Sequence, residues 1–178
     1  MIEDELTHIS ALKEAGDHPA ARRHAVALAQ AHRDDVRAQL AAAYACDRLG
    51  LEHEAIDYYE HASALGVPST ERPGFLVGFG STLRNLGRIE EAVACLAQAT
   101  QEYPDNAALH AFLSLAQHSA GRFDLALASM LKAALQAARP DGFGSYARAL
   151  GGYQAELAAA TDRSATPARN AGSPLSTR

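Results

Sequence analysis

The fold of this protein is decided by a stretch in the middle of the chain, residues 79–92, which reads FGSTLRNLGRIEEA. One amphipathic helical pattern ends at Gly87, and a second one, which contains Ala92, begins directly after it. Glycine lacks a Cβ atom and therefore adopts the left-handed conformation that terminates a helix without steric cost. The stretch predicts two helices joined by a tight turn.

The same arrangement recurs along the chain. Turn glycines stand at Gly16, Gly50, Gly87 and Gly121, so their spacings are 34, 37 and 34 residues. An alanine follows each of them five residues later, and twelve residues later there is another alanine in the last three repeats and Leu28 in the first. These alanines are Ala21, Ala55, Ala92, Ala126, Ala62, Ala99 and Ala133. Such a period is typical of a stacked repeat array, in which each helix pair buries its apolar face against its neighbours.

The amphipathic patterns predict an all-α protein of about four antiparallel helix pairs. The expected pairs are 3–15 with 18–32, 35–48 with 52–65, 72–86 with 89–102, and 106–119 with 123–137. The corresponding repeat units are about 2–34, 35–68, 69–105 and 106–139. The longer interval has a local cause in residues 66–73, where Pro68 and Pro73 lengthen the loop and Ser69 or Thr70 is the expected N-cap of the next helix.

Beyond the fourth pair, apolar residues recur at spacings of three and four: Phe143, Tyr146, Leu150, Tyr153 and Leu157. This stripe predicts a C-terminal capping helix over residues 143–160, so that the repeat domain covers residues 1–160. The remaining residues, 161–178, are rich in Ser, Thr, Pro, Ala and Arg and have a single Leu. We expect them to form a disordered tail.

Composition excludes several classes of function. The formal net charge of −5 argues against nucleic-acid binding, which depends on Lys and Arg. The two cysteines, Cys46 and Cys95, are 49 residues apart and have no metal-type spacing. The acidic N-terminus lacks a signal-peptide pattern, and no apolar run approaches the roughly 20 residues of a membrane span. These features predict a cytoplasmic protein with no membrane contact.

The pattern resembles the tetratricopeptide repeat, a 34-residue helix-turn-helix unit. The third unit matches best, with Phe79-Gly80 and Leu83 in its first helix and Ala92, Leu96, Ala99 and Pro104 in its second. The segment 81–88 is similar to a stretch typical of a bacterial subgroup, tetratricopeptide repeat group 5, over about residues 34–157. The resemblance implies a right-handed superhelix (an α-solenoid) and protein–protein interaction through a concave groove lined by the first helix of each pair.

The family register assigns groove positions to every first helix. They are Glu3, Leu6, Ser10 and Lys13; Arg37, Leu40, Tyr44 and Arg48; Gly74, Val77, Gly78, Ser81 and Arg84; and Ala108, Ala111, Phe112, Leu115 and His118. The partner-binding residues that we predict among these and beside them are Arg37, Tyr44, Arg48, Gly78, Ser81, Arg84, Asn85, Phe112, Leu115 and His118.

Two hypotheses follow for the groove. Lys13, Arg48, Arg84 and His118 put one basic or potentially basic group per repeat near one rim, which would receive an acidic segment or a terminal carboxylate. The competing interpretation is that these groups only complement the helix macrodipole. The second hypothesis is that the small residues Gly74, Gly78 and Ser81 leave a pocket for an apolar anchor, against the alternative that they only ease helix packing.

Nothing in the sequence indicates catalysis, a metal or a cofactor. Three histidine pairs are each eight residues apart, whereas a helical metal site needs spacing of four. The glycine-rich run 74–80 lacks the Lys and Ser/Thr of a phosphate loop. The carboxylate clamp of chaperone-binding members is not reproduced, because Leu6, Ser10 and Leu40 stand at its places.

The sequence therefore predicts a non-enzymatic bacterial adaptor that binds a peptide segment or helix of another protein, with an acidic segment as one candidate. An alternative is a structural protein that assembles with a second copy through its C-terminal helix. An enzyme is the third and weakest interpretation.

Overall fold

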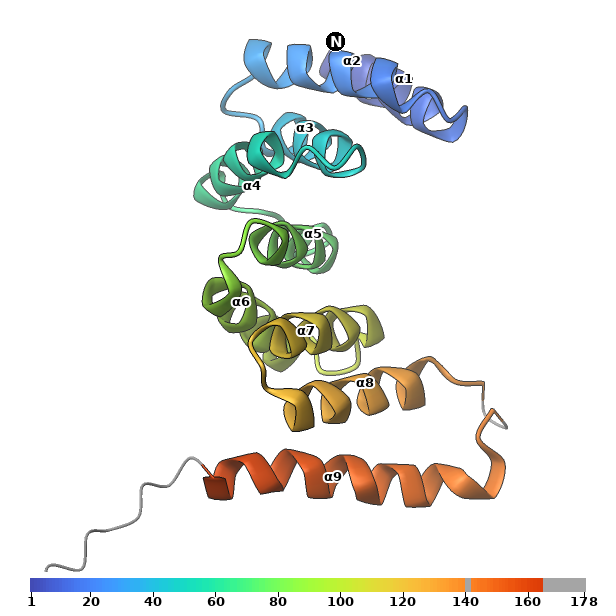
Figure 1. Ribbon diagram of the computed structural model, residues 1–178. Coiled ribbons are helices and arrows are strands. Elements are labelled where there is room, and N and C mark those ends of the chain that lie inside the picture. Colours follow the sequence, from blue (N-terminus) through green and yellow to red (C-terminus); the bar gives the residue numbers. More distant parts are fainter. Residues whose placement is uncertain (140–141, 165–178) are drawn as a thin grey trace, which may run out of the picture.

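The computed structural model describes residues 1–139 and 142–164 and contains only helices within them. The elements are α1 (Ile2–Glu14), α2 (His18–Ala31), α3 (Val36–Asp47), α4 (Glu52–Leu65), α5 (Arg72–Asn85), α6 (Ile89–Glu102), α7 (Ala107–Ser119), α8 (Phe123–Ala137), the 3₁₀ turn η1 (Gly144–Tyr146) and α9 (Ala147–Ser164). Helices α1 to α8 form four antiparallel pairs that stack into a right-handed superhelix (Figure 1). The predicted all-α solenoid is confirmed.

The turns between paired helices have the predicted glycine chemistry. Gly16, Gly50, Gly87 and Gly121 all have positive φ, between 69° and 78°. In each turn the residue after the glycine donates its N–H to a carbonyl five residues earlier, as in Arg88 to Leu83 at 2.9 Å. This hydrogen bond is the one that closes a Schellman motif.

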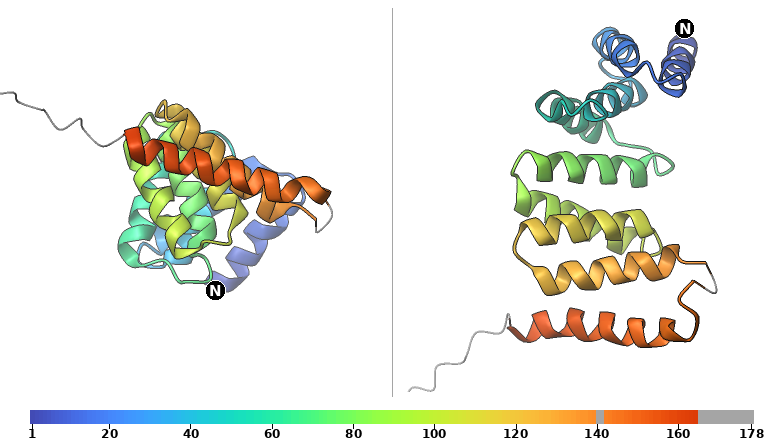
Figure 2. Two further views of the ribbon diagram at one scale, coloured as in Figure 1. Left: turned by 90° about the horizontal axis from the view of Figure 1, so that it is seen from below. Right: turned by 45° about the vertical axis from the view of Figure 1, so that its right-hand side comes forward.

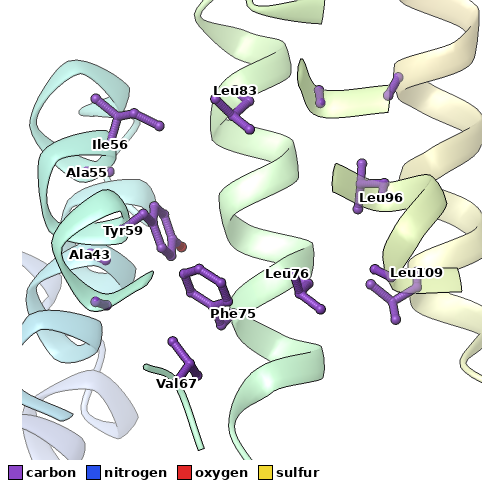
Figure 3. Close-up of a cluster of buried hydrophobic side chains, with 14 of the residues drawn as sticks. Ala43, Ala55, Ile56, Tyr59, Val67, Phe75, Leu76, Leu83, Leu96 and Leu109 are labelled. Atoms are coloured by element: carbon purple, nitrogen blue, oxygen red, sulfur yellow. The ribbon is translucent and has the colours of Figure 1, made fainter. Parts of the chain in front are cut away.

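The repeated alanines lie where neighbouring helices cross. The six in the last three units are at most 5% exposed, and Ala21 in the first unit is 1% exposed. Without large side chains at these places, the second helix of each pair lies close to its neighbours. Figure 3 shows the result in the middle of the array, where Tyr59 of α4 points toward α5 and lies near Phe75. The two ring centroids are 6.0 Å apart.

The loops between pairs are closed by side chains at one equivalent position of the following helix. Gln39, four residues after the N-cap Asp35, donates to the carbonyl oxygens of Ala29, His32 and Arg33. His110, four residues after the N-cap Asn106, bonds the carbonyl of Pro104 at 2.9 Å. Both side chains reach the residue six positions earlier.

The lengthened loop replaces this polar contact with an apolar one. Its equivalent residue is Phe75, which is buried, and Val67 from the loop is buried in the same cluster (Figure 3). The predicted N-cap at Ser69 or Thr70 is wrong, because the N-cap residue of α5 is Glu71, and it makes no side-chain cap bond. Pro73 stands in the first turn of α5, where a missing N–H costs no helical hydrogen bond.

The C-terminal cap differs from the expected one. The α-helix begins at Ala147, after the 3₁₀ turn, and continues to Ser164. It runs antiparallel to α8 and packs against it (Figure 2). The apolar stripe is split, because Leu150 and Leu157 are partly buried whereas Tyr146 and Tyr153 are 74% and 58% exposed. Residues 165–178 of the predicted tail lie outside the described residues.

Candidate functional site

The first helices of successive pairs lie side by side and form one surface of the array. Helix α3 lies next to α1 and α5, and α5 lies next to α7. The seam between α1 and α3 carries two adjoining hollows, of about 360 Å³ and about 290 Å³. Lys13 and Tyr44 line both of them. We call these two hollows together the α1–α3 groove.

Seven of the eight groove positions predicted for the first two units line the α1–α3 groove. They are Leu6, Ser10, Lys13, Arg37, Leu40, Tyr44 and Arg48. The remaining position, Glu3, instead bonds the guanidinium of Arg37. Each hollow is therefore built mainly by two helices whose facing positions follow from the repeat register.

Tyr44 stands at the centre of the α1–α3 groove and is held there by packing. Its ring meets the ring of Tyr59 edge to face, with centroids 5.9 Å apart. Its hydroxyl lies over Gly74, where an added Cβ would be 3.7 Å away. Burial, with a smaller contribution from the nearby Glu71 carboxylate, raises the pKa of Tyr44 to about 12. The hydroxyl thus stays protonated at neutral pH, and it has no hydrogen-bond partner in the described chain.

The cations along the predicted basic rim are not equivalent. Lys13 and Arg48 both line the larger hollow, and neither has an ion-pair partner among residues 1–139 and 142–164. Arg84 is already engaged, because it donates to Asn85 Oδ1 at 2.9 Å and to Ser119 Oγ at 3.5 Å. A ligand carboxylate meets the least competition at Lys13 and Arg48.

Two further members of the predicted set also have partners inside the chain. Arg37 forms ion pairs with Glu3 and, at 2.9 Å, with Asp35. Asn85 donates to Glu52 Oε1 at 3.2 Å. These contacts give both residues a structural role that the sequence pattern did not indicate.

The predicted pocket in the middle of the array is not open at Gly78. Tyr59 fills the space beside this glycine, because a Cβ built on Gly78 would lie 2.2 Å from the Tyr59 hydroxyl. The prediction of bare space at Gly78 is therefore wrong, and the packing interpretation holds there. Ser81, one turn further on, is partly buried.

The groove residues predicted on α7 form a separate surface. Phe112 packs against the central core, and Leu115 is 41% exposed. The ring of His118 meets that of Phe123 at the start of α8, with centroids 5.2 Å apart. None of these three lines the α1–α3 groove.

The sequence analysis missed a buried polar contact behind the groove. The carboxylate of Asp47, at the end of α3, accepts hydrogen bonds from the hydroxyls of Tyr59 at 3.2 Å and Thr82 at 3.3 Å. Burial raises the pKa of Asp47, and the two hydrogen bonds counteract that effect. The contact joins α3, α4 and α5. No periodic pattern indicates it, because it depends on three single residues in different helices.

The comparisons with known proteins agree with this architecture. A model of the tetratrico peptide repeat, in its group 5 form, matches residues 36–157, and a second tetratricopeptide repeat model matches residues 6–65. The chain therefore belongs to the tetratricopeptide repeat family, whose fold is a protein-interaction module. No curated protein matches the sequence significantly.

Solved structures of the same fold include MamA and YrrB. MamA from Desulfovibrio magneticus RS-1 (residues 41 to the end) superposes with a TM-score of 0.66 at 13% identity, over 93% of this chain and 97% of that one. MamA MSR-1 gives a TM-score of 0.66 at 16% identity, over 76% of each chain. YrrB, described as a TPR protein with an unusual peptide-binding site, gives 0.63 at 15% identity, over 89% and 90%. At these identities the likeness establishes the fold alone.

Two searches of residues 1–139 and 142–164 bear on other classes of function. None of their helices is both long and apolar enough to cross a membrane. No group of three His, Cys, Asp or Glu side chains gathers there in a way that would hold a metal ion.

Proposed function

We propose that this protein is an adaptor that binds a peptide segment or helix of a partner protein in the α1–α3 groove. The observation that carries the proposal is the coincidence of the family's groove positions with two real hollows, centred on Tyr44. Helix-in-groove and extended-peptide recognition both use such a surface, with a few apolar anchors and polar groups that fix orientation. The structural neighbour YrrB, by its own description, has a peptide-binding site.

The groove chemistry defines the kind of segment that fits. Leu6, Leu40 and the Tyr44 ring provide apolar contact for an anchor side chain, and the Tyr44 hydroxyl is free to hydrogen-bond. Lys13 and Arg48 lie together at one end and are free to pair with a carboxylate. A partner segment with an apolar residue followed or preceded by an acidic one therefore matches the groove.

The acidic groups nearby make this preference directional. Glu14 lines the larger hollow beside Lys13, and Glu71 lines the smaller one beside Tyr44. A carboxylate placed near Glu71 would be repelled, whereas one placed between Lys13 and Arg48 would be attracted. The proposal thus assigns the acidic end of the ligand to the larger hollow.

Affinity capture with matched charge reversals tests this proposal. The wild-type protein, Arg48→Glu and the control Arg23→Glu serve as baits in lysate of the producing organism. Arg23 is an exposed arginine of α2 that lines neither hollow. We expect a protein that is retained by the wild type and the control but lost with Arg48→Glu. Equal retention by all three baits would remove the groove from the account.

A further inference from the structure

The exposed large apolar side chains of this protein gather at the C-terminal end of the array. Nine large hydrophobic side chains are exposed within the described residues, and six of them belong to α7, α8, η1 and α9. These six are Leu115, Phe123, Leu127, Met130, Tyr146 and Tyr153. Contiguous exposed apolar patches on a folded domain mark interaction surfaces.

Three of these side chains form a stripe along α8. Phe123, Leu127 and Met130 are 61%, 52% and 38% exposed, and their spacing of four and three residues puts them on one face of the helix. The His118–Phe123 ring contact connects this stripe to the outer surface of α7. The stripe is therefore not an isolated exposed residue but one side of α8.

The stripe is exposed because α9 does not occupy the place of a further first helix. Helices α3, α5 and α7 each contact the first helix of the preceding pair as well as the second. Helix α9 packs against α8 but has no Cα atom within 8 Å of α7 in the described chain. One side of α8 that a further unit would cover is consequently left open (Figure 1).

Helix α9 and η1 extend the same surface. Tyr146 and Tyr153 are seven residues apart, and both flank the face of α9 that Leu150 and Leu157 turn toward α8. Because α9 runs antiparallel to α8, the helical phase puts these two tyrosines on the same side of the molecule as the α8 stripe. The C-terminal surface, defined by Phe123, Leu127, Met130, Tyr146 and Tyr153, is thus continuous across two helices.

We infer that the C-terminal surface binds a second copy of this chain across a two-fold axis. The charges at the two ends of α8 favour this occupant. Asp124 stands at the Phe123 end and Arg139 just beyond the other end, and neither side chain has an ion-pair partner in the described residues. When two copies of α8 pack antiparallel, Asp124 of each copy approaches Arg139 of the other, so the surface is complementary to itself.

The available area suits a dimer of moderate affinity. The three exposed aromatic rings alone supply on the order of 400 Å² per copy. A standard interface buries about 800 Å² per partner. Leu115, Leu127, Met130 and the neighbouring alanines of α8 contribute to the remainder. This surface lies at the opposite end of the array from the α1–α3 groove (Figure 2), so dimer formation and groove binding are independent claims.

Sedimentation equilibrium over a concentration series tests the inference. We expect a concentration-dependent dimer for the wild type, a monomer for Leu127→Glu, and an unchanged dimer for the control Leu65→Glu. Leu65 is 36% exposed at the end of α4, away from the C-terminal surface. Circular dichroism confirms that each variant is folded. A wild type that stays monomeric at every concentration, or a Leu127→Glu variant that dimerises as well as the wild type, would overturn the inference.

A charge-swap experiment tests the two-fold geometry itself. Asp124→Arg and Arg139→Asp should each weaken self-association by roughly tenfold, because each creates two like-charge contacts per dimer. An equimolar mixture of the two variants should form a heterodimer in which both pairs are opposite in charge again. A mixture that associates no better than the separate variants would contradict the antiparallel pairing.

Discussion

The hydroxyl oxygen of Tyr59 lies directly against Gly78, so that a β-carbon built on this glycine would stand 2.2 Å from it. The ring of Tyr59 is fully buried and spans the space between α3 and α5. Its hydroxyl also donates to Asp47 and thereby reaches α3. The absence of a side chain at residue 78 is thus what allows one tyrosine to hold three helices together.

Gly78→Ala should therefore destabilise the protein although alanine favours helix. We expect a loss of about 1–3 kcal/mol, the range for an overpacked core. Gly74→Ala is the matched control in the same helix, because its Cβ would be 3.7 Å from the nearest side-chain atom. That variant should be neutral or more stable by up to about 1 kcal/mol. Urea unfolding measures both, and equal effects of the two substitutions would refute the steric account.

Gln39 should be more important for stability than its polar side chain suggests. It is 2% exposed and donates toward three carbonyl groups at the end of α2. Gln39→Met keeps the shape but leaves these acceptors unpaired, so we expect a loss of about 1–3 kcal/mol. Gln30→Met, on the exposed side of α2, should stay within about 0.5 kcal/mol of the wild type in the same urea titration.

His110 should make stability depend on pH. Burial lowers its pKa, and the hydrogen bond to Pro104 only partly counteracts this. The unfolded chain therefore binds a proton more readily, and stability should fall as pH drops through the ordinary value near 6.5 and level off below the folded value. His110→Gln places at this position the residue that fulfils the equivalent role at Gln39. We expect the variant to match the wild type near pH 8 and to lose less stability at pH 5.5 than the wild type does. Thermal melts at the two pH values measure this difference, and identical pH profiles would contradict it.

These residues show how far sequence reasoning reaches in a repeat protein. The turn glycines, the crossing alanines and the groove register were predictable, because each depends on local backbone geometry and is repeated in every unit. The contacts of Tyr59, Gln39 and Arg84 were not, because each joins side chains of different helices and depends on a rotamer that spacing does not determine. The same reason explains the error at Gly78, where the helical register was right but the neighbouring side chain from α4 was not foreseen.

The position of the candidate groove follows the same division. Register placed Tyr44 and Arg48 on the first-helix surface, as the hollows lined by them agree. Only the structure distinguished the free cations Lys13 and Arg48 from Arg84, which is bonded to Asn85 and Ser119. That distinction moves the expected binding centre from the middle of the array to its N-terminal half.

The most direct test of the central claim is site-specific photo-crosslinking at residue 44. A benzophenone amino acid replaces Tyr44 in one sample and the exposed Ala94 of α6 in the control, and the crosslinked partner peptides are sequenced by mass spectrometry. The account predicts one defined peptide segment attached at residue 44, absent from the control and reduced by Arg48→Glu. No crosslink at residue 44, or the same products at residues 44 and 94, would contradict a partner bound in the α1–α3 groove.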